Sequence, residues 1–251
     1  MTEWIFIRGL QREAAHFGDF GTDFEAAILG AKVHFVDLPG NGVHHRVRTP
    51  LSVTAMMERV RAEVRERGIH RPHVLALSLG GMVTCDWAQR HPEELSGIVL
   101  VNTSFGGYSP MWHRFRPGAI PITLAVASER DPVRRELKLL PLASNRSEVY
   151  TATAARWAGV ARVRPVSKMS SLRQLFAAAR FRAQPHAPRV PHLILVGEGD
   201  RLVQSSCSHR IAAAWGSPIS AHPSAGHDLT LDAGPWMIEQ ISAWLKASPV
   251  A

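Results

Sequence analysis

The sequence predicts an α/β fold, a doubly wound and mainly parallel sheet with an inserted helical cap. Three observations lead to this prediction. Short apolar runs alternate with stretches at helical spacing, which is the pattern of repeated strand and helix units. Several runs, such as residues 97–102, are almost continuously apolar, as in parallel strands buried on both faces. Between residues 105 and 189 only helical patches occur, so the predicted core comprises residues 1–104 and 190–251 and the cap residues 105–189.

The individual elements follow from this alternation. The predicted strands cover residues 4–7, 32–37, 73–77, 97–102, 192–196 and 218–221. The predicted core helices cover residues 24–29, 51–67, 79–90, 205–215 and 234–245, and the helical patches of the cap cover residues 120–128, 132–139, 149–158 and 171–181. Parallel strands of this kind have right-handed crossovers, and ligands bind outside the carboxyl ends of the strands.

Length and composition indicate an ordinary globular protein. The chain has 251 residues, of which 45% are hydrophobic and 20% charged, so it can bury a large core and lacks the signature of disorder. The N-terminus enters a strand at once, without room for a signal peptide, and no run of roughly 18 apolar residues predicts a transmembrane helix. We therefore expect a cytoplasmic protein without membrane insertion, in which Cys85 and Cys207 are reduced.

Ser78 lies at a sharp turn between the predicted strand 73–77 and the helix 79–90. The residues two before and two after it are Ala76 and Gly80, both small enough for a turn in which these positions almost touch. Such a turn strains the serine backbone, which proteins tolerate when the strain presents a side chain for chemistry. The turn predicts a nucleophile, although a serine that only caps the following helix has the same local sequence.

Two other loops that follow strands carry the partners of a serine nucleophile. A histidine removes the hydroxyl proton, and a carboxylate fixes the tautomer of that histidine and stabilises its charged form. Asp200 follows the strand 192–196, and His227 follows the strand 218–221. Loops after parallel strands meet at one edge of the sheet, so we predict Ser78, Asp200 and His227 as the catalytic residues.

Each partner has rivals in the sequence. Asp200 has the alternative role of a turn aspartate, and Glu198 is the nearest competing carboxylate. Asp228 is less suitable, because a neighbour of the histidine does not easily reach its ring from the correct side. Among the thirteen histidines, His222 is nearest to His227 but is expected at a strand end.

An attacked carbonyl develops negative charge, which prepositioned N–H groups stabilise by roughly 3 to 4 kcal/mol each. The backbone N–H of Leu79 is one candidate, because it lies at the positive end of the helix that follows Ser78. The backbone N–H of Leu10 is the other, because Gly9 lets the loop after the first strand turn sharply. We expect these two groups to form an oxyanion hole, although Gly9-Leu10 is also compatible with an ordinary turn.

Together, these segments resemble the α/β-hydrolase superfamily over nearly the whole chain outside the insertion. The resembling segments are Arg8-Gly9-Leu10, Asp37-Leu38-Pro39-Gly40-Asn41-Gly42, Leu77-Ser78-Leu79-Gly80-Gly81, Gly197-Glu198-Gly199-Asp200 with Arg201-Leu202-Val203, and Ala225-Gly226-His227. The chain order Ser, Asp, His is the one this superfamily uses. Within the superfamily, the chain is similar to compact serine esterases with a helical cap, including pimeloyl-carrier-protein methyl esterases. The resemblance implies a sheet that begins at the family's third strand and chemistry without a cofactor. Ala76 and Arg8 depart from the usual pattern of the superfamily and leave the three predicted catalytic residues intact.

The predicted cap is the basic part of the chain. Residues 105–189 contain fifteen Lys and Arg against four Asp and Glu, a net charge of +11, whereas the remainder carries −3. This field would attract an anionic substrate or an acidic carrier protein, although a solvated arginine-rich surface has the same composition. We expect neither nucleic acid nor a metal, because no binding motif accompanies the charge and the histidines lack metal-ligand spacing. Five large apolar residues of the predicted cap are candidates for lining an acyl pocket beneath it. The same residues are also compatible with ordinary helix packing: Met111, Trp112, Phe115, Trp157 and Phe176.

These features predict a serine hydrolase that cleaves a carboxylic ester or thioester through an acyl-enzyme. A non-catalytic binding or sensor protein on the same scaffold is the alternative from a different class. An acyltransferase or perhydrolase would use the same three residues, depending on whether the closed cap excludes water. The sequence leaves these alternatives open, along with the substrate and the oligomeric state.

Overall fold

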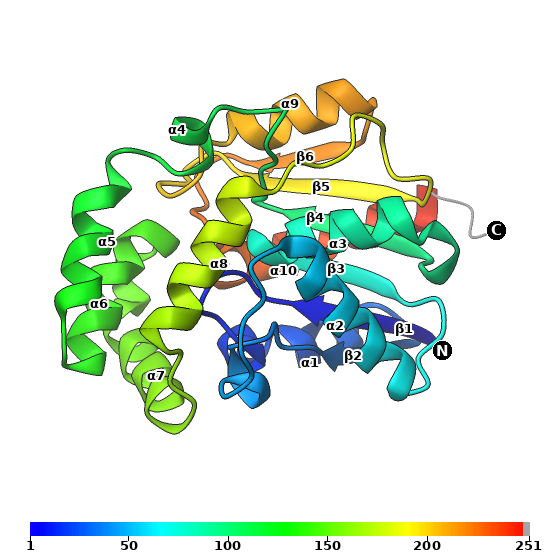
Figure 1. Cartoon of the computed structure of the whole chain (residues 1–251). Coiled ribbons are helices and arrows are strands. Elements are labelled where there is room, and N and C mark those ends of the chain that lie inside the picture. The colour runs from blue at the N-terminus through cyan, green and yellow to red at the C-terminus, as the bar shows by residue number, and fades with distance from the viewer. Residues whose placement is uncertain (248–251) are drawn as a thin grey trace.

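The computed structural model describes residues 1–247 and contains a six-stranded sheet with helices on both faces (Figure 1). The strand order is β2-β1-β3-β4-β5-β6, and every neighbouring pair is parallel. The strands are β1 (Thr2–Ile7), β2 (Ala31–Phe35), β3 (His73–Leu77), β4 (Gly97–Val101), β5 (His192–Gly197) and β6 (Ile219–His222). The predicted strands and the parallel sheet are confirmed. The end of the predicted core, residues 248–251, lies outside the described residues.

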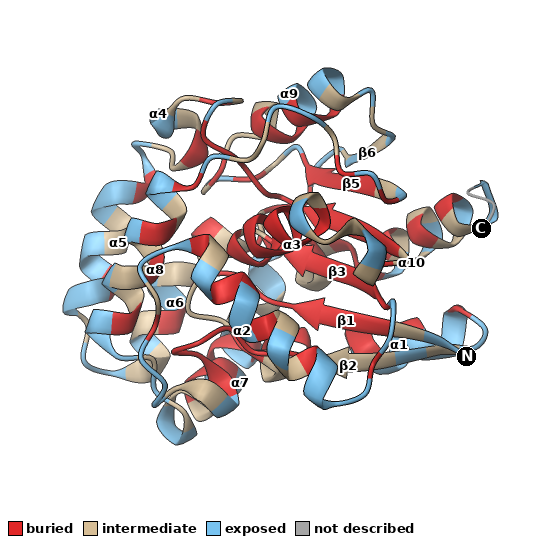
Figure 2. Ribbon diagram, turned by 45° about the vertical axis from the view of Figure 1, so that its right-hand side comes forward, coloured by how far each residue is buried: buried red, intermediate tan, exposed pale blue. Residues whose placement is uncertain are grey.

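The helices of the core are α1 (Phe20–Ala27), α2 (Val53–Glu66), α3 (Leu79–Arg90), α9 (Ser206–Trp215) and α10 (Leu229–Ala247). One face of the sheet packs against α2, α3 and α9, and the other packs against α1 and α10. Successive side chains along a strand point to opposite faces of the sheet. On β3, Val74 and Ala76 pack on the face covered by α2, α3 and α9, and Leu75 packs on the face covered by α1 and α10. Figure 2 shows the central strands buried, as their apolar runs predict. Short 3-10 helices cover Ala14–Phe17, Gly42–His44, Pro92–Glu94 and Ser147–Val149.

Two core helices begin earlier than the sequence predicts. α1 begins at Phe20 rather than at residue 24, because the buried Phe20 extends its packed face, and the predicted end at Leu29 is fully exposed. α10 begins at Leu229 rather than at residue 234, and its backbone is non-helical at Ala233. Since Pro235 cannot bond back to the preceding turn, the sequence pattern identified only the part after this kink.

The predicted cap, residues 105–189 and hereafter the insertion, falls between β4 and β5 and lies beyond the carboxyl ends of the strands at the left of Figure 1. Its helices are α4 (Met111–Arg114), α5 (Ala119–Ser128), α6 (Pro132–Ala143), α7 (Tyr150–Val163) and α8 (Lys168–Arg180). The chain enters and leaves the insertion side by side, since Gly106 and Arg182 form a parallel bridge. Leu140, Ala154 and Trp157 form a small apolar cluster within it.

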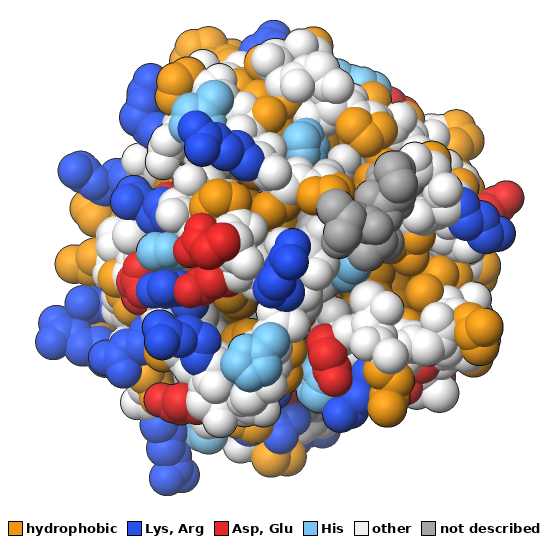
Figure 3. Space-filling model, turned by 90° about the vertical axis from the view of Figure 1, so that its right-hand side faces the viewer, with side chains coloured by type: hydrophobic (Ala, Val, Ile, Leu, Met, Phe, Trp, Pro, Cys, Tyr) orange, Lys and Arg blue, Asp and Glu red, His pale blue; other side chains and the backbone are white. Residues whose placement is uncertain are grey.

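The insertion and the opposite end of the molecule differ in charge. Figure 3 shows the opposite face, on which acidic side chains lie among the basic ones. In the insertion, Arg164 pairs with Glu13 and Arg146 with Glu148, whereas Arg114 is buried. Of these two carboxylates, Glu13 lies outside the insertion, whereas Glu148 is already included in its net charge of +11. None of the helices in residues 1–247 is long and apolar enough to cross a membrane.

Candidate active site

Ser78 occupies the turn between β3 and α3 and has the strained backbone that the sequence predicts. Its φ of +54° and ψ of −115° are rare for a residue other than glycine. The Ser78 N–H donates to the Val101 carbonyl (2.9 Å), and the Thr103 hydroxyl donates to the Ser78 carbonyl (2.8 Å). Gly80 is required by the turn, because a Cβ there would lie 2.7 Å from the Arg8 carbonyl oxygen. Ser78 remains partly exposed, so a substrate can reach it.

His227 and Asp200 form a directly bonded pair in the loops after β6 and β5. Nδ1 of His227 lies 2.7 Å from Oδ2 of Asp200. The other carboxylate oxygen of Asp200 accepts the backbone N–H groups of Leu202 (2.8 Å) and Val203 (2.9 Å), which orient the carboxylate. The Asp200 side chain is 1% exposed and that of His227 is 13% exposed. This geometry leaves Nε2 as the imidazole nitrogen available for proton transfer.

The competing carboxylates are engaged elsewhere. Oε1 of Glu198 lies 2.6 Å from Nε2 of His209 on α9. Asp228 forms a buried ion pair with Arg8, in which Nη1 of the arginine lies 3.1 Å from Oδ1 of the carboxylate. Asp200 is therefore the carboxylate that the fold brings to the His227 ring.

The surroundings of His227 favour its charged form. Burial disfavours the imidazolium, but the Asp200 carboxylate, its hydrogen bond and the charge of Asp228 together raise the pKa of His227 above its ordinary value of 6.5. An imidazole with a raised pKa readily accepts a proton from a hydroxyl group. His222, its nearest rival in the sequence, ends β6 and accepts the Ala225 N–H on Nδ1 (3.0 Å), which is a structural role.

Two consecutive residues after β4 hold the loops of Ser78 and His227. Thr103 binds the Ser78 carbonyl, and the side-chain amide of Asn102 donates to the His227 carbonyl (2.8 Å). Asn102 also accepts the N–H of Gly197 at the end of β5 (2.9 Å). Within residues 1–247, the His227 ring has a hydrogen bond with Asp200 and none with the Ser78 hydroxyl.

The loop after β1 passes directly against the serine. A Cβ at Gly9 would lie 3.0 Å from the Ser78 Cβ and 3.5 Å from its Oγ, so a side chain there would press against the serine. The loop is also a turn, in which the Arg12 N–H donates to the Gly9 carbonyl (3.2 Å). Gly9 and Ser78 are in contact, Leu10 follows Gly9, and Leu79 follows Ser78. The backbone N–H groups of Leu10 and Leu79 therefore lie next to this contact.

The Asp37 to Gly42 segment supports this loop from the end of β2. Oδ1 of Asp37 accepts the Ala14 N–H (2.8 Å), and Oδ2 accepts the Val43 N–H (3.0 Å). Asn41 is fully buried, and its side-chain amide donates to the Arg12 carbonyl (2.9 Å). The resembling segment therefore holds the loop after β1 in place, a role that its turn residues alone did not reveal.

Helix α8 of the insertion also binds this loop. The Gln11 N–H donates to Oε1 of Gln174 (3.0 Å), and Nε2 of Gln174 donates to Oδ1 of Asn41 (2.7 Å). Gln174 is fully buried, and Gln11 has a φ of +58°. Neither contact could be predicted from the sequence, because a single glutamine on a helix has no pattern that indicates its partner. The insertion is thereby coupled to the loop that carries the Leu10 N–H.

The five residues predicted for an acyl pocket lie in different settings. Trp157 is fully buried in the cluster of the insertion, and the Arg12 guanidinium lies 4.2 Å from the centroid of its ring. Phe115 is half-buried. The exposed residues are Met111 (46%), Trp112 (62%) and Phe176 (47%). A pocket formed by these five side chains stays a prediction, with Trp157 packed inside the insertion and the α4 and α8 residues partly exposed.

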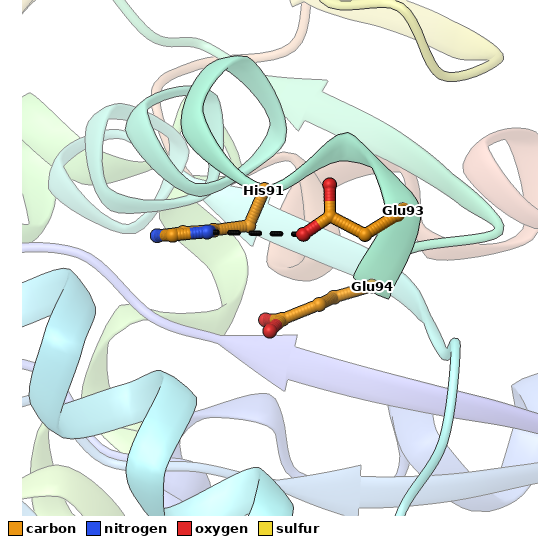
Figure 4. Close-up of side chains that lie close together, drawn as sticks. All are labelled: His91, Glu93 and Glu94. Atoms are coloured by element: carbon orange, nitrogen blue, oxygen red, sulfur yellow. Dashed lines mark ion pairs between the residues drawn. The ribbon is translucent and has the colours of Figure 1, made fainter.

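One group of side chains in the described part of the chain has ligand atoms close enough for a metal ion, namely His91, Glu93 and Glu94 (Figure 4). Nδ1 of His91 lies 3.9 Å from the Glu93 carboxylate. Nε and Nη2 of Arg61 each lie 2.6 Å from an oxygen of Glu94, and these bonds lower the pKa of that carboxyl. A carboxylate already held by a guanidinium is poorly placed to bind a cation, so this group is an ion-pair network after α3.

Comparisons with known proteins place the chain among hydrolases. A family model described as Serine aminopeptidase, S33 (Hydrolase_4) matches residues 4–233. The pimeloyl-[acyl-carrier protein] methyl ester esterase of Edwardsiella ictaluri (strain 93-146) is 40% identical over 73 residues, 29% of this chain and 26% of that protein. The 2-hydroxy-6-oxononadienedioate/2-hydroxy-6-oxononatrienedioate hydrolase of Burkholderia vietnamiensis is 30% identical over 136 residues, 53% of this chain and 46% of that protein. The chain therefore matches about a quarter of the length of the methyl ester esterase and about half of the length of the second hydrolase.

Solved structures share the fold over nearly the whole length. The enol-lactonase from Burkholderia xenovorans LB400 has a TM-score of 0.79 at 17% identity, covering 98% of this chain and 92% of that one. A thermophilic esterase from Thermogutta terrifontis has a TM-score of 0.75 at 17% identity. The match covers 98% of this chain and 90% of the esterase. At this identity the likeness concerns the fold, which is that of the α/β hydrolases. Since the family model covers almost the entire chain, this protein belongs to the Serine aminopeptidase S33 family of α/β hydrolases.

Proposed function

We propose that the protein is a serine hydrolase that cleaves a carboxylic ester or thioester through an acyl-enzyme. The observation that carries the proposal is the common anchoring of three elements at the carboxyl end of the sheet. The strained Ser78 and the bonded pair of His227 and Asp200 are tied to consecutive residues, Asn102 and Thr103. A nucleophile, a base and an orienting carboxylate at one place are what acyl transfer requires.

In the proposed reaction, the Ser78 oxygen attacks the substrate carbonyl carbon while Nε2 of His227 takes the hydroxyl proton. The negative charge on the carbonyl oxygen is stabilised by the N–H groups of Leu79 and Leu10, and Asp200 stabilises the imidazolium. The carbonyl then re-forms, the bond to the leaving oxygen or sulfur breaks, and His227 protonates the released alcohol or thiol. Water attacks the acyl-enzyme by the same route, which releases the carboxylic acid and restores the serine.

The charge of the insertion supports an anionic substrate or an acidic carrier protein. Of its basic side chains, Arg134, Lys138 and Arg162 are exposed on the outer helices α6 and α7. The partial similarity to an esterase named for an acyl-carrier-protein ester agrees with both ideas. Electrostatic attraction of this kind acts mainly on the rate of association and falls with ionic strength.

The test is hydrolysis of p-nitrophenyl esters from acetate to decanoate by the wild type and by Ser78→Ala. We expect the variant to lose about four orders of magnitude or more in kcat, because the nucleophile is gone. Ser128→Ala, at an exposed serine of α5, is the matched control and should retain full activity. Full activity in Ser78→Ala would refute the proposal.

Labelling by a fluorophosphonate separates the alternatives. A hydrolase should be labelled at Ser78, and the label should disappear in Ser78→Ala. A wild type that is neither labelled nor active would be a binding protein on the hydrolase scaffold. Product analysis with added alcohol or peroxide distinguishes hydrolysis from acyl transfer or perhydrolysis, because each acceptor gives a different acyl product.

A further inference from the structure

Three arginines line a cavity at the base of the insertion, outside the proposed catalytic site. The cavity has a volume of about 410 Å³, and Arg114, Arg180 and Arg182 contribute to its wall. None of the residues that line it is acidic. Small-molecule sites typically have volumes of roughly 300–1,000 Å³, so this cavity is large enough for an organic ligand.

The positive charges around this cavity have no carboxylate partner within residues 1–247, where the arginine ion pairs involve other residues. Arg114 is 8% exposed and donates to the carbonyls of Ala178 (2.5 Å) and Ala179 (3.1 Å) near the end of α8. Its Nε is buried without a hydrogen-bond partner among the described residues. Burial, together with the charge of Arg182, lowers the pKa of Arg114. An anion would relieve the repulsion between these like charges.

Two glycines line the cavity beside the arginines. Gly107 has a φ of +96°, and a Cβ there would approach only Nη2 of Arg182, at 3.8 Å. At Gly106 a Cβ would lie 3.1 Å from Nη1 of Arg114, so the backbone passes close to the buried guanidinium. Gly106 and Arg182 also form the bridge between the two connections of the insertion. A ligand in the cavity would therefore contact both connections at once.

We propose that this arginine cavity binds a phosphate-bearing anion. Guanidinium groups donate paired N–H bonds to phosphate oxygens, and a tetrahedral dianion accepts such bonds from several directions. A carboxylate carries a single charge and two oxygens, which suits three arginines less well. The volume leaves room beside the phosphoryl group for the organic part of a phosphate monoester. This site is independent of the chemistry proposed for Ser78.

The test is calorimetric titration of the full chain with inorganic phosphate and with glycerol 3-phosphate at constant ionic strength. The variants are Arg180→Gln, Arg182→Gln and the double variant, because both residues are exposed whereas Arg114 also holds α8. We expect saturable binding by the wild type and a loss of about tenfold in affinity for each substitution, which removes a charge-assisted hydrogen bond. Tighter binding of glycerol 3-phosphate identifies a phosphate monoester as the ligand class, and equal affinities identify free phosphate.

Two controls make the outcome specific. Arg162→Gln removes the same charge from an exposed position on α7, outside the cavity lining, and should bind phosphate like the wild type. Ser78→Ala should also bind normally, which separates this inference from the proposed hydrolysis. The inference is overturned if phosphate acts no differently from chloride, or if the double variant binds phosphate as tightly as Arg162→Gln.

Discussion

The side-chain amide of Asn102 donates a hydrogen bond of 2.8 Å to the backbone carbonyl of His227. Asn102 lies directly after β4 with a φ of +45°, a conformation that asparagine adopts more easily than most residues. It also binds the Gly226 carbonyl (3.0 Å) and accepts the Gly197 N–H (2.9 Å). One side chain thus sets the distance between the His227 loop and β5, which leads to Asp200.

Asn102→Gly should therefore weaken both the fold and the reaction. Glycine tolerates the backbone conformation, so the variant removes only the three hydrogen bonds, with a cost of about 2–4 kcal/mol in the free energy of unfolding. We expect kcat to fall while KM changes little, because Asn102 is buried. Urea unfolding and ester hydrolysis measure the two effects. A folded variant with wild-type kcat would show that Asn102 does not position His227.

Gly9→Ala tests the contact between the oxyanion loop and the nucleophile. The added methyl group would lie 3.0 Å from the Ser78 Cβ, which displaces the loop that carries the Leu10 N–H. Loss of one oxyanion donor typically costs about 10²–10³ in kcat, so we expect a decrease of this size.

Gly159→Ala is the matched control for that experiment. Gly159 lies on α7, and a Cβ there would meet no atom within 4 Å. Alanine should leave kcat unchanged and stabilise the helix by roughly 0.5–1 kcal/mol. If Gly9→Ala were as active as Gly159→Ala, the loop after β1 would have no part in stabilising the oxyanion.

The pH dependence of hydrolysis should report the pKa of His227. The neutral imidazole is the base, so kcat/KM should rise with pH through a midpoint above 6.5, the ordinary value for histidine. Asp200→Asn removes the carboxylate that raises this pKa, so the midpoint should shift to lower pH. The same variant should lose about 10⁴-fold in kcat, since the asparagine no longer holds the productive tautomer. A wild-type midpoint below 6.5 would contradict the pairing.

The same pKa shift predicts how stability depends on pH. Because the folded-state pKa of His227 is raised, the protonated imidazole stabilises the fold below its unfolded-state pKa, about 6.5. This contribution is lost as pH rises through the folded-state pKa. Urea unfolding between pH 5 and 9, at about one-unit steps, should show this loss in the wild type and a smaller loss in Asp200→Asn. An identical profile in both proteins would contradict the prediction.

The buried pair of Arg8 and Asp228 should make a large contribution when only one partner is removed. Arg8→Met leaves the Asp228 carboxylate buried without its guanidinium, which should cost about 3–5 kcal/mol in the free energy of unfolding. The double variant Arg8→Met/Asp228→Leu leaves neither charge and should recover most of that loss. A double variant as unstable as Arg8→Met would show that the arginine acts through packing instead.

Acid unfolding gives a second measurement of this pair. Burial raises the pKa of Asp228, but the charge and the hydrogen bonds of Arg8 lower it further, so that this pKa is below its ordinary value of 3.8. The carboxylate therefore stabilises the fold above the unfolded-state pKa, and this stability is lost as pH falls through the lower folded-state pKa. The double variant should lose less stability than the wild type below about pH 4.

Several features of the site were predictable because their causes are local. The Ser78 turn requires small residues at fixed offsets, and its strained backbone follows from that requirement. Asp200 and His227 follow strands whose apolar runs are visible in the sequence, and parallel strands end at one edge. The positioning residues were not predictable. Gln11 and Gln174, for example, are 163 positions apart, and nothing near either one indicates the contact.

The sequence by itself determined the parallel sheet, the turn at Ser78 and the loops that carry Asp200 and His227, since periodicity and turn chemistry act over a few residues. Only the tertiary structure decided that Asn102 anchors the His227 loop and that three arginines contribute to the wall of one cavity. It also decided that Trp112 and Phe176 are exposed, whereas Trp157 is fully buried. The physical reason is that a helical pattern identifies an apolar residue but not the surface that covers it, which depends on how distant segments pack.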